Sequence, residues 1–183
     1  MMRIIKCIAS VVFTAILISC SDLDNSRVEE LLRTESAYPR VVDIRVYCND
    51  QSTAREVVDK NLARHGYVKA RLVHTPDDIG KPLITFTEQA APYLVETNDT
   101  LRSIDIQRVK VADEVFRHVR NIEISPKGDR AVVDFSTELV NRTPFIVLFQ
   151  QNIAGEQLRR TFFTKKDDRW MWDGKIVKMP KKE

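Results

Sequence analysis

The sequence predicts an α+β fold, with one compact domain in which a helix–strand–helix–hairpin unit is followed by an antiparallel β-meander. Two observations carry this prediction. In the first half, helix-start signals precede apolar residues spaced three and four apart, a pattern typical of amphipathic helices. In the second half, apolar and polar residues alternate in runs separated by turn sequences, which is typical of half-buried strands.

The first helix is expected to begin at Ser26, because Ser26 and Glu29 have the spacing of a capping box. It should end before Tyr38-Pro39, since a residue that precedes proline avoids helical backbone. Its apolar side chains share one face: Val28, Leu31 and Leu32. Residues 41–47 then alternate apolar and polar side chains and predict a strand.

A second helix is expected from a capping box at Thr53 and Glu56. Its apolar stripe consists of Ala54, Val57, Val58 and Leu62. Gly66 follows where a left-handed C-terminal cap is needed, and His65 is expected in the last helical turn.

Two short strands, residues 67–73 and 83–86, are joined by the turn sequence TPDDIGKP and predict a hairpin. Thr87 then opens a short helix to about residue 95, although Pro92 removes one of its backbone hydrogen bonds. These elements complete the front unit of the predicted domain.

The second half is expected to be rich in strands. Residues 104–111 change the phase of their alternation, as a bulged strand would. Residues 112–124 fit either a strand or a helix, because their apolar residues also share a helical face. Residues 130–140 predict a strand with two distinct faces. One face carries Ala131, Val133, Phe135 and Leu139, and the other carries Arg130, Asp134, Ser136 and Glu138.

Thr143-Pro144 is a helix cap followed by proline and predicts a short helix to about residue 152. Residues 157–164 and 169–177 are expected to close the domain as a hairpin across the turn sequence KKDD.

The N-terminus has the pattern of a secretory signal peptide. Arg3 and Lys6 are the only charged residues before Asp22, and an apolar segment, IASVVFTAILI, follows them. This segment is shorter than the roughly 20 apolar residues that a membrane-spanning helix requires. We therefore expect residues 1–19 to be removed during export.

The end of this segment, Leu17-Ile18-Ser19-Cys20, resembles the lipobox of bacterial lipoproteins. The resemblance implies cleavage between Ser19 and Cys20 and attachment of a diacylglyceryl group to the Cys20 thiol. Acyl chains then anchor a protein to a membrane, at about 0.8 kcal/mol per buried methylene. The expected localisation is therefore the cell envelope.

The residues after Cys20 indicate to which membrane a lipoprotein is sorted. Ser21, in place of an aspartate, favours the outer membrane over the inner membrane, as in enteric bacteria. The acidic Asp22 and Asp24 also suit the surface-export signals of other bacterial groups. Whether the domain faces the periplasm or the cell surface therefore stays open.

Removal of 19 residues from 183 leaves 164, enough for one domain with a proper core. The expected organisation is a signal peptide at 1–19, a lipidated Cys20 with a short tether at 20–25, and a single domain at 26–183. Possible sub-units of that domain are 26–97 and 98–183.

The charge balance and the cysteine count exclude several classes of protein. Without Arg3 and Lys6, 27 basic residues face 26 acidic ones, which argues against a general polyanion binder. Cys48 is the one cysteine left with a free thiol, so the domain has no internal disulfide. We interpret Cys48 as a buried thiol at a strand end.

Residues 53–95 resemble part of a winged-helix domain in their order of helix, glycine, strand, turn, strand and helix. The resemblance implies phosphate contacts from Arg55, Lys60, Arg64, Lys69 and Arg71. Acidic neighbours dilute these charges, one helix of the winged-helix order is missing, and an exported protein does not meet the chromosome. Nucleic acid is therefore not an expected partner.

The tail FFTKKDDRWMWDGKI resembles the last hairpin of nuclear-transport-factor-2-like and cystatin-like domains. Trp170 and Trp172 share one face of the predicted strand, which Phe162 or Phe163 would meet across the hairpin. The favoured interpretation is hydrophobic core. The alternative is a ligand pocket or a partner contact at Trp170, Trp172 and Phe162.

The sequence contains no motif of a known catalytic or metal site. His65, His74 and His118 lack ligand spacing, and the acidic pairs at 77–78 and 167–168 suit turns. No cofactor, no metal and no enzyme activity is expected.

We therefore expect a lipid-anchored, non-catalytic binding or accessory module whose partners are the membrane and an envelope protein. One alternative is a small-molecule binder with an aromatic pocket beside Trp170 and Trp172. The other is a hydrolase whose site assembles from residues distant in sequence.

Overall fold

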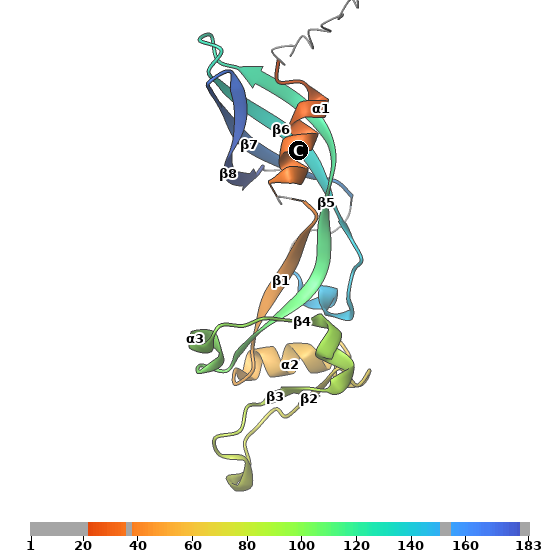
Figure 1. Ribbon diagram of the computed structural model, residues 1–183. Coiled ribbons are helices and arrows are strands. Elements are labelled where there is room, and N and C mark those ends of the chain that lie inside the picture. The colour runs from red at the N-terminus through yellow and green to blue at the C-terminus, as the bar shows by residue number, and fades with distance from the viewer. Residues whose placement is uncertain (1–21, 36–37, 151–154, 180–183) are drawn as a thin grey trace, which may run out of the picture.

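The computed structural model describes residues 22–35, 38–150 and 155–179. The predicted α+β class is confirmed, because helices accompany one large, curled antiparallel sheet (Figure 1). The predicted signal peptide at 1–19, its cleavage residue Ser19 and the lipid-anchor residue Cys20 lie outside the described residues.

The large sheet has the strand order β1-β5-β6-β7-β8, and every neighbouring pair is antiparallel. Strands β5 to β8 follow one another in space as they do along the chain, so the predicted meander is confirmed. A short sixth strand, β4, pairs with the lower part of β5 on the side that β6 leaves open. The strands are β1 (Arg40–Tyr47), β4 (Leu94–Val95), β5 (Ile106–Ile124), β6 (Arg130–Val140), β7 (Gln157–Lys166) and β8 (Arg169–Lys178).

Strand β5 settles the ambiguous segment 112–124, which is strand throughout. Pairing with β6 from Asp113 to Ile124 decides between the two periodicities, because this edge of the segment gains backbone hydrogen bonds. Strand β1 pairs with the start of the segment, as far as Glu114. The predicted phase change corresponds to a bulge: Val42 faces Ala112 and Asp43 faces Lys110, so one residue of β5 is left unpaired.

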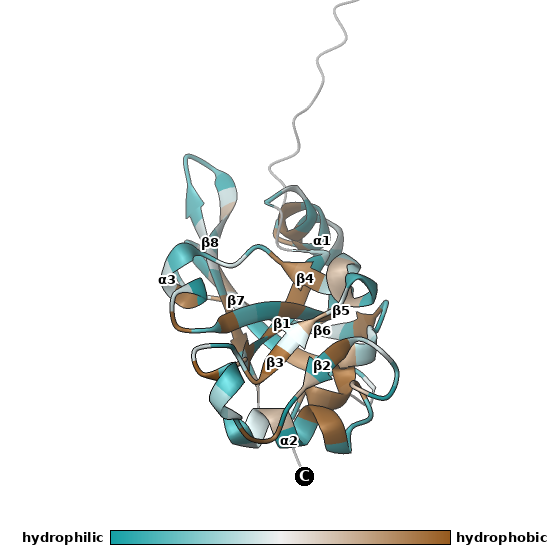
Figure 2. Ribbon diagram, turned by 90° about the horizontal axis from the view of Figure 1, so that it is seen from below, coloured by the Kyte–Doolittle hydropathy of each residue, from teal (hydrophilic) through white to brown (hydrophobic). Residues whose placement is uncertain are grey.

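Helix α1 (Asn25–Thr34) begins earlier than predicted. Its N-cap is Asp24, which accepts a hydrogen bond from the Arg27 N–H at 2.7 Å, so the capping box predicted at Ser26 is wrong. A carboxylate at this position also interacts favourably with the helix dipole. Leu23 is buried, so the domain begins before residue 26 and the predicted tether at 20–25 is shorter. In Figure 2, α1 carries both hydrophilic and hydrophobic residues.

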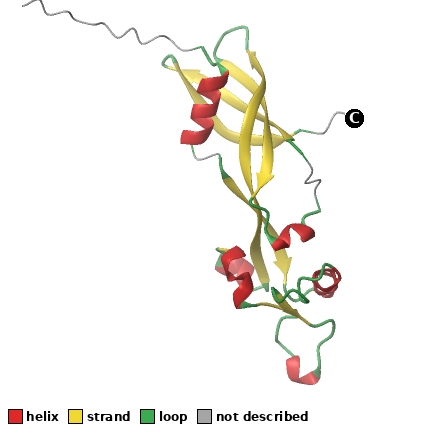
Figure 3. Cartoon of the chain, turned by 90° about the vertical axis from the view of Figure 1, so that its right-hand side faces the viewer, coloured by secondary structure: helices red, strands yellow, loops and turns green. Residues whose placement is uncertain are grey.

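The upper core lies between α1 and the curled strands β5 to β8 (Figure 3). It contains the three predicted residues of the α1 face. Its members are Leu23, Val28, Leu31, Leu32, Tyr38, Phe116, Ala131, Val133, Phe135, Phe163 and Trp170. The rings of Phe116 and Phe135 stack with centroids 5.7 Å apart, and Tyr38 meets Phe135 edge-on. Aromatic burial therefore dominates this half of the molecule.

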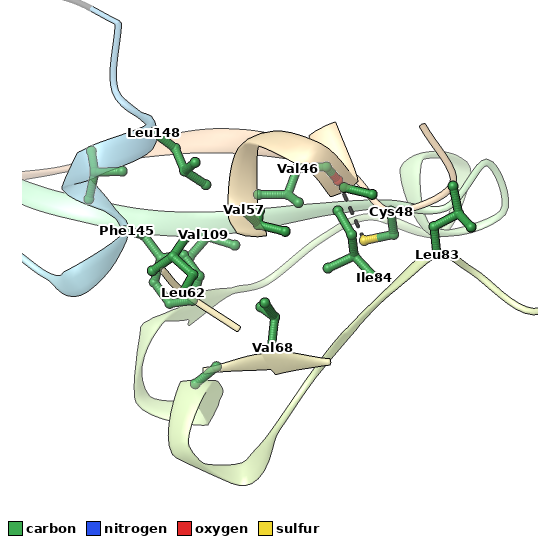
Figure 4. Packing of buried hydrophobic residues seen from close by; sticks show 13 residues of the cluster. Val46, Cys48, Val57, Leu62, Val68, Leu83, Ile84, Val109, Phe145 and Leu148 are labelled. Atoms are coloured by element: carbon green, nitrogen blue, oxygen red, sulfur yellow. Dashed lines mark hydrogen bonds between the residues drawn. The ribbon is translucent and has the colours of Figure 1, made fainter. Parts of the chain in front are cut away.

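The lower core lies between α2 (Gln51–Asp59), the hairpin of β2 (Val68–Ala70) and β3 (Ile84–Phe86), and the lower halves of β1 and β5 (Figure 4). Its members are Val46, Cys48, Ala54, Val57, Leu62, Val68, Leu83, Ile84, Ala90, Val109, Val111, Phe145 and Leu148. Phe145 is fully buried, and the rings of Tyr67, Phe86 and Tyr93 lie within 6.0 Å of its centroid.

Helix α2 also begins at an aspartate. Asp50 is its N-cap and accepts hydrogen bonds from the N–H and the hydroxyl of Thr53, both at 2.7 Å, so the capping box predicted at Thr53 and Glu56 is wrong. The helix ends at Asp59, and His65 therefore lies in the turns that follow it. Gly66 has the predicted left-handed backbone, with φ of +80°.

Some exposed and buried positions differ from the predicted faces. Val58 of α2 is 38% exposed, although the predicted stripe includes it. Ser136 of β6 is fully buried, although the alternation directs it outward. Its Oγ lies 3.2 Å from His118 Nδ1, at a register shift of β5 that brings the imidazole over this position.

The predicted short helices are 3-10 helices: η2 (Glu88–Tyr93) and η3 (Pro144–Leu148). Pro92 lies inside η2. Because proline has no backbone N–H to donate, it disfavours a regular α-helix at this position. Thr143 caps η3 as predicted, accepting from the Phe145 N–H at 3.2 Å. Two further short elements are η1 (Pro76–Asp78) and α3 (Asp99–Arg102).

Candidate binding site at the waist of the molecule

A cavity of about 430 Å³ lies where the two edge strands of the curled sheet approach each other. Strand β1 contributes residues 40–43 and strand β8 contributes Ile176 and Lys178, although these strands are at opposite ends of the strand order. The middle strands contribute Glu114, Leu139, Gln157 and Arg159, and Phe149 completes the lining. We call this space the waist cavity, because it lies between the upper and lower cores.

Strand alternation places Glu114 inside the sheet. It precedes the upper-core residue Phe116 by two positions on β5, so both side chains point inward. The Glu114 side chain is only 1% exposed, and the Arg159 side chain, inward on β7, is 10% exposed. Two opposite charges are therefore buried beside the waist cavity.

Both oxygens of Glu114 accept hydrogen bonds from charged or hydroxyl donors. Oε1 accepts from the Thr137 hydroxyl at 2.5 Å and from Arg159 Nε at 2.8 Å. Oε2 accepts from Arg40 Nε at 2.6 Å. The carboxylate therefore joins β1, β5, β6 and β7 at one point, and its burial is compensated by ionic hydrogen bonds.

These contacts determine the protonation of Glu114. Burial by itself raises the pKa of Glu114, but the Thr137 hydroxyl and the guanidinium groups of Arg40 and Arg159 together outweigh it, so the pKa lies below its ordinary value. Glu114 is therefore a carboxylate at neutral pH. Since two guanidinium groups face this one carboxylate, the cluster has one excess positive charge.

Tyr38 borders the same cluster. The guanidinium carbon of Arg40 lies 5.4 Å from the centroid of the Tyr38 ring, a cation–π contact. Burial first, and the charge of Glu114 second, raise the pKa of Tyr38 well above its ordinary value. Tyr38 is therefore a neutral phenol, and it leaves the charge balance of the cluster unchanged.

Asp43, the other acidic residue of the lining, is already neutralised. Arg108 donates to it in a bidentate manner, with Nε 3.1 Å from Oδ1 and Nη2 2.5 Å from Oδ2. Lys178 adds a further cation to the lining. The waist cavity as a whole therefore presents excess positive charge to an occupant.

The arrangement suits anion binding better than proton transfer. A general acid or base near neutral pH needs a pKa close to that pH, whereas Glu114 has a lowered pKa and donors on both oxygens. Within residues 22–35, 38–150 and 155–179, no group of three or more His, Cys, Asp or Glu side chains is placed to hold a metal ion.

The predicted aromatic site is divided by the structure. Trp170 belongs to the upper core and is 5% exposed, as the core interpretation expects. Trp172 is half-buried against that core and donates from Nε1 to Thr161 Oγ1 at 2.7 Å. Its cross-strand neighbour is Phe163, and Phe162 lies on the opposite face of β7. Neither tryptophan lines the waist cavity.

Cys48 is a buried thiol after the end of β1, as interpreted from the sequence. It belongs to the lower core, and its Sγ donates to the Val46 carbonyl oxygen at 3.6 Å (Figure 4). Burial raises the pKa of Cys48 to about 11, with Asp105 contributing in the same direction. The thiol is therefore protonated at neutral pH and poorly nucleophilic.

The other predicted polar residues have local partners. His74 Nε2 lies 3.2 Å from Asn49 Oδ1, and His118 lies against Ser136. The acidic pair at 167–168 occupies a turn, as expected, whereas the pair at 77–78 lies in the 3-10 helix η1 between β2 and β3.

Sequence reasoning missed Glu114 and Arg159, the two charges at the centre of the waist cavity. A signal for each is present in the sequence. Glu114 shares a strand face with the apolar Ala112 and Phe116, and Arg159 shares a strand face with Phe163. A charged residue at an inward position of a strand indicates an internal ion pair or a ligand site.

Comparison with protein-family models, with curated proteins and with solved structures finds no match to this chain. The function proposed below therefore depends on the sequence motif and on the geometry of the described residues alone.

Proposed function

We propose that this chain is a lipid-anchored bacterial lipoprotein whose single domain acts as a non-catalytic binding or accessory module at the cell envelope. The observation that carries the proposal is the tetrapeptide Leu17-Ile18-Ser19-Cys20 after a short basic and apolar start. None of the described helices is long and apolar enough to cross a membrane.

The position of Leu23 supports a short tether. Leu23 is 4% exposed in the upper core, and three residues span at most about 11 Å of extended chain. Lipid chains on Cys20 would therefore hold the α1 end of the domain against the bilayer surface. Such tethering raises the effective concentration of the domain near membrane partners.

Replacement of the anchor residue tests the proposal. The full chain with Cys20→Ala is expected to lose incorporation of radiolabelled fatty acid and to leave the membrane fraction, because the lipid attaches to that thiol. Mass spectrometry of the wild-type N-terminus should show a chain that begins at a lipid-modified Cys20.

Cys48→Ala is the matched control, since it removes the buried cysteine of the lower core and leaves the tetrapeptide intact. It should keep both the label and the membrane fractionation. An unmodified Cys20 in the wild type, or equal fractionation of Cys20→Ala and wild type, would contradict the anchor.

A further inference from the structure

The waist cavity has donors that Glu114 does not use. Arg40 directs Nε and Nη2 to Glu114, and its Nη1 has no hydrogen-bond acceptor within the described part of the chain. The Arg40 side chain is 41% exposed, so this donor is accessible to a molecule that enters from solvent. A guanidinium with an unused face is suited to a carboxylate or phosphate oxygen.

Part of the same lining is apolar. Val42, Leu139 and Ile176 lie on three different strands that converge on the cavity, and Phe149 follows η3 beside them. The volume of about 430 Å³ falls within the range of about 300–1,000 Å³ that is typical of small-molecule sites. An occupant therefore meets cationic donors and aliphatic side chains in the same cavity.

We propose that the waist cavity binds a small amphiphilic anion, with its acidic headgroup at Arg40 and Arg159 and its apolar body against Val42, Leu139 and Ile176. Glu114 positions the two guanidinium groups. Its negative charge offsets one of their two positive charges when the site is empty. This inference deepens the proposed role as a binding module and specifies its ligand class. It does not depend on the anchor at Cys20.

Binding is measured by isothermal titration of the full chain held in amphipol, with five probes. Octanoate and octyl phosphate carry both parts of the proposed ligand, with two alternative headgroups. Acetate and inorganic phosphate carry the headgroup alone, and 1-octanol carries the apolar chain alone. We expect one of the two amphiphilic anions to bind at least about tenfold more tightly than 1-octanol and than its own headgroup.

Arg40→Gln is the test variant and Arg117→Gln its matched control. Arg117 is also on the large sheet, is 44% exposed and pairs with a glutamate, Glu138, but it does not line the waist cavity. Arg40→Gln should weaken the amphiphilic anion about tenfold, the effect of losing one ionic hydrogen bond, and leave 1-octanol unchanged. Arg117→Gln should change neither.

A second variant, Lys178→Gln, removes a cation of the lining at an exposed position. It should weaken binding of the amphiphilic anion only a few-fold, because solvent and salt screen an exposed charge. The proposal is overturned by equal affinity for 1-octanol and the amphiphilic anions, by equal affinity for a headgroup alone, or by equal losses in Arg40→Gln and Arg117→Gln. Each variant should keep the lipid on Cys20, because Cys20 is unchanged. A loss of anion binding therefore tests the waist cavity and not the anchor.

Discussion

Arg159 donates from Nε to Glu114 Oε1 at 2.8 Å, and both side chains are almost fully enclosed by the curled sheet. Burying two charges is costly, because the attraction between them must offset the loss of hydration of both. Such a pair contributes little net stability compared with an apolar pair of the same size. Removing only one partner of the pair is strongly destabilising, because the other partner is left as an unpaired charge inside the protein.

Glu114→Gln should therefore lower the free energy of unfolding by about 3 kcal/mol, since Arg159 loses its counter-ion in a buried position. Urea denaturation measures the change. Glu138→Gln is the matched control, because Glu138 pairs with Arg117 on the exposed side of the sheet and should cost at most about 1 kcal/mol. Equal losses in the two variants would show that Glu114 is effectively solvated.

The lowered pKa of Glu114 makes stability depend on pH. An unfolded glutamate takes up its proton near pH 4.5, whereas folded Glu114 keeps its charge to lower pH. Between these two pKa values the unfolded state binds more protons, so the free energy of unfolding rises with pH. The contribution of Glu114 is present above about pH 4.5 and is lost as the pH falls through the folded pKa.

Urea titrations from pH 7 to about pH 3 should show a steeper loss of stability in the wild type than in Glu114→Gln. The comparison isolates Glu114, because the exposed acidic residues are the same in both proteins. Parallel curves would mean that the pKa of Glu114 is not lowered by folding.

Cys48 should react slowly in the folded protein. Its pKa of about 11 is two units above the ordinary value of 9.0, so the thiolate fraction at pH 8 is about 100-fold smaller. Burial in the lower core adds a steric barrier. Site-resolved mass spectrometry after iodoacetamide treatment should find Cys48 alkylated only when urea is added; rapid labelling of the native protein would exclude the buried position.

The turn of the last hairpin should accept a stabilising substitution. Asp167 and Asp168 both have left-handed backbone, with φ of 48° and 58°, which is the geometry of a two-residue type I′ turn. Asparagine followed by glycine adopts this geometry more readily, so the double variant Asp167→Asn with Asp168→Gly should raise the free energy of unfolding by about 0.4–1 kcal/mol. A lower melting temperature would mean that the turn has another conformation.

Leu23 should contribute to stability although it precedes the first helix. It is 4% exposed in the upper core, so Leu23→Ala is expected to cost about 2–5 kcal/mol, as for other buried leucines. Leu72→Ala is the matched control at a residue that is 40% exposed, and its effect should stay within about 0.5 kcal/mol. An unchanged free energy of unfolding in Leu23→Ala would mean that Leu23 belongs to the tether and not to the folded domain.

The sequence predicted elements whose signals are local. The alternation of β6 gave its bounds, and the KKDD turn located the final hairpin, because each depends on residues that are neighbours in the chain. The helix starts were misplaced by two or three residues because Ser26 and Thr53 matched the capping-box spacing. Asp24 and Asp50 cap instead, and both were within reach of the same reasoning.

The candidate site was beyond such reasoning. Arg40 and Glu114 are 74 residues apart, and Glu114 and Arg159 are 45 apart. They meet only because the sheet curls until β1 and β8 approach each other, and sheet curvature depends on bulges and on long-range pairing. The two tryptophans were singled out for their size, and the same size explains why Trp170 lies in the upper core and Trp172 packs against it.

Strand β5 has a consequence for how this protein can vary. It supplies Val109 to the lower core and Phe116 to the upper core on one unbroken strand. Adding or deleting a single residue between them would reverse inward and outward side chains along everything beyond that point. Homologous chains should therefore differ in length at the β2–β3 loop and at the hairpin turns, while the number of residues between these two positions is conserved.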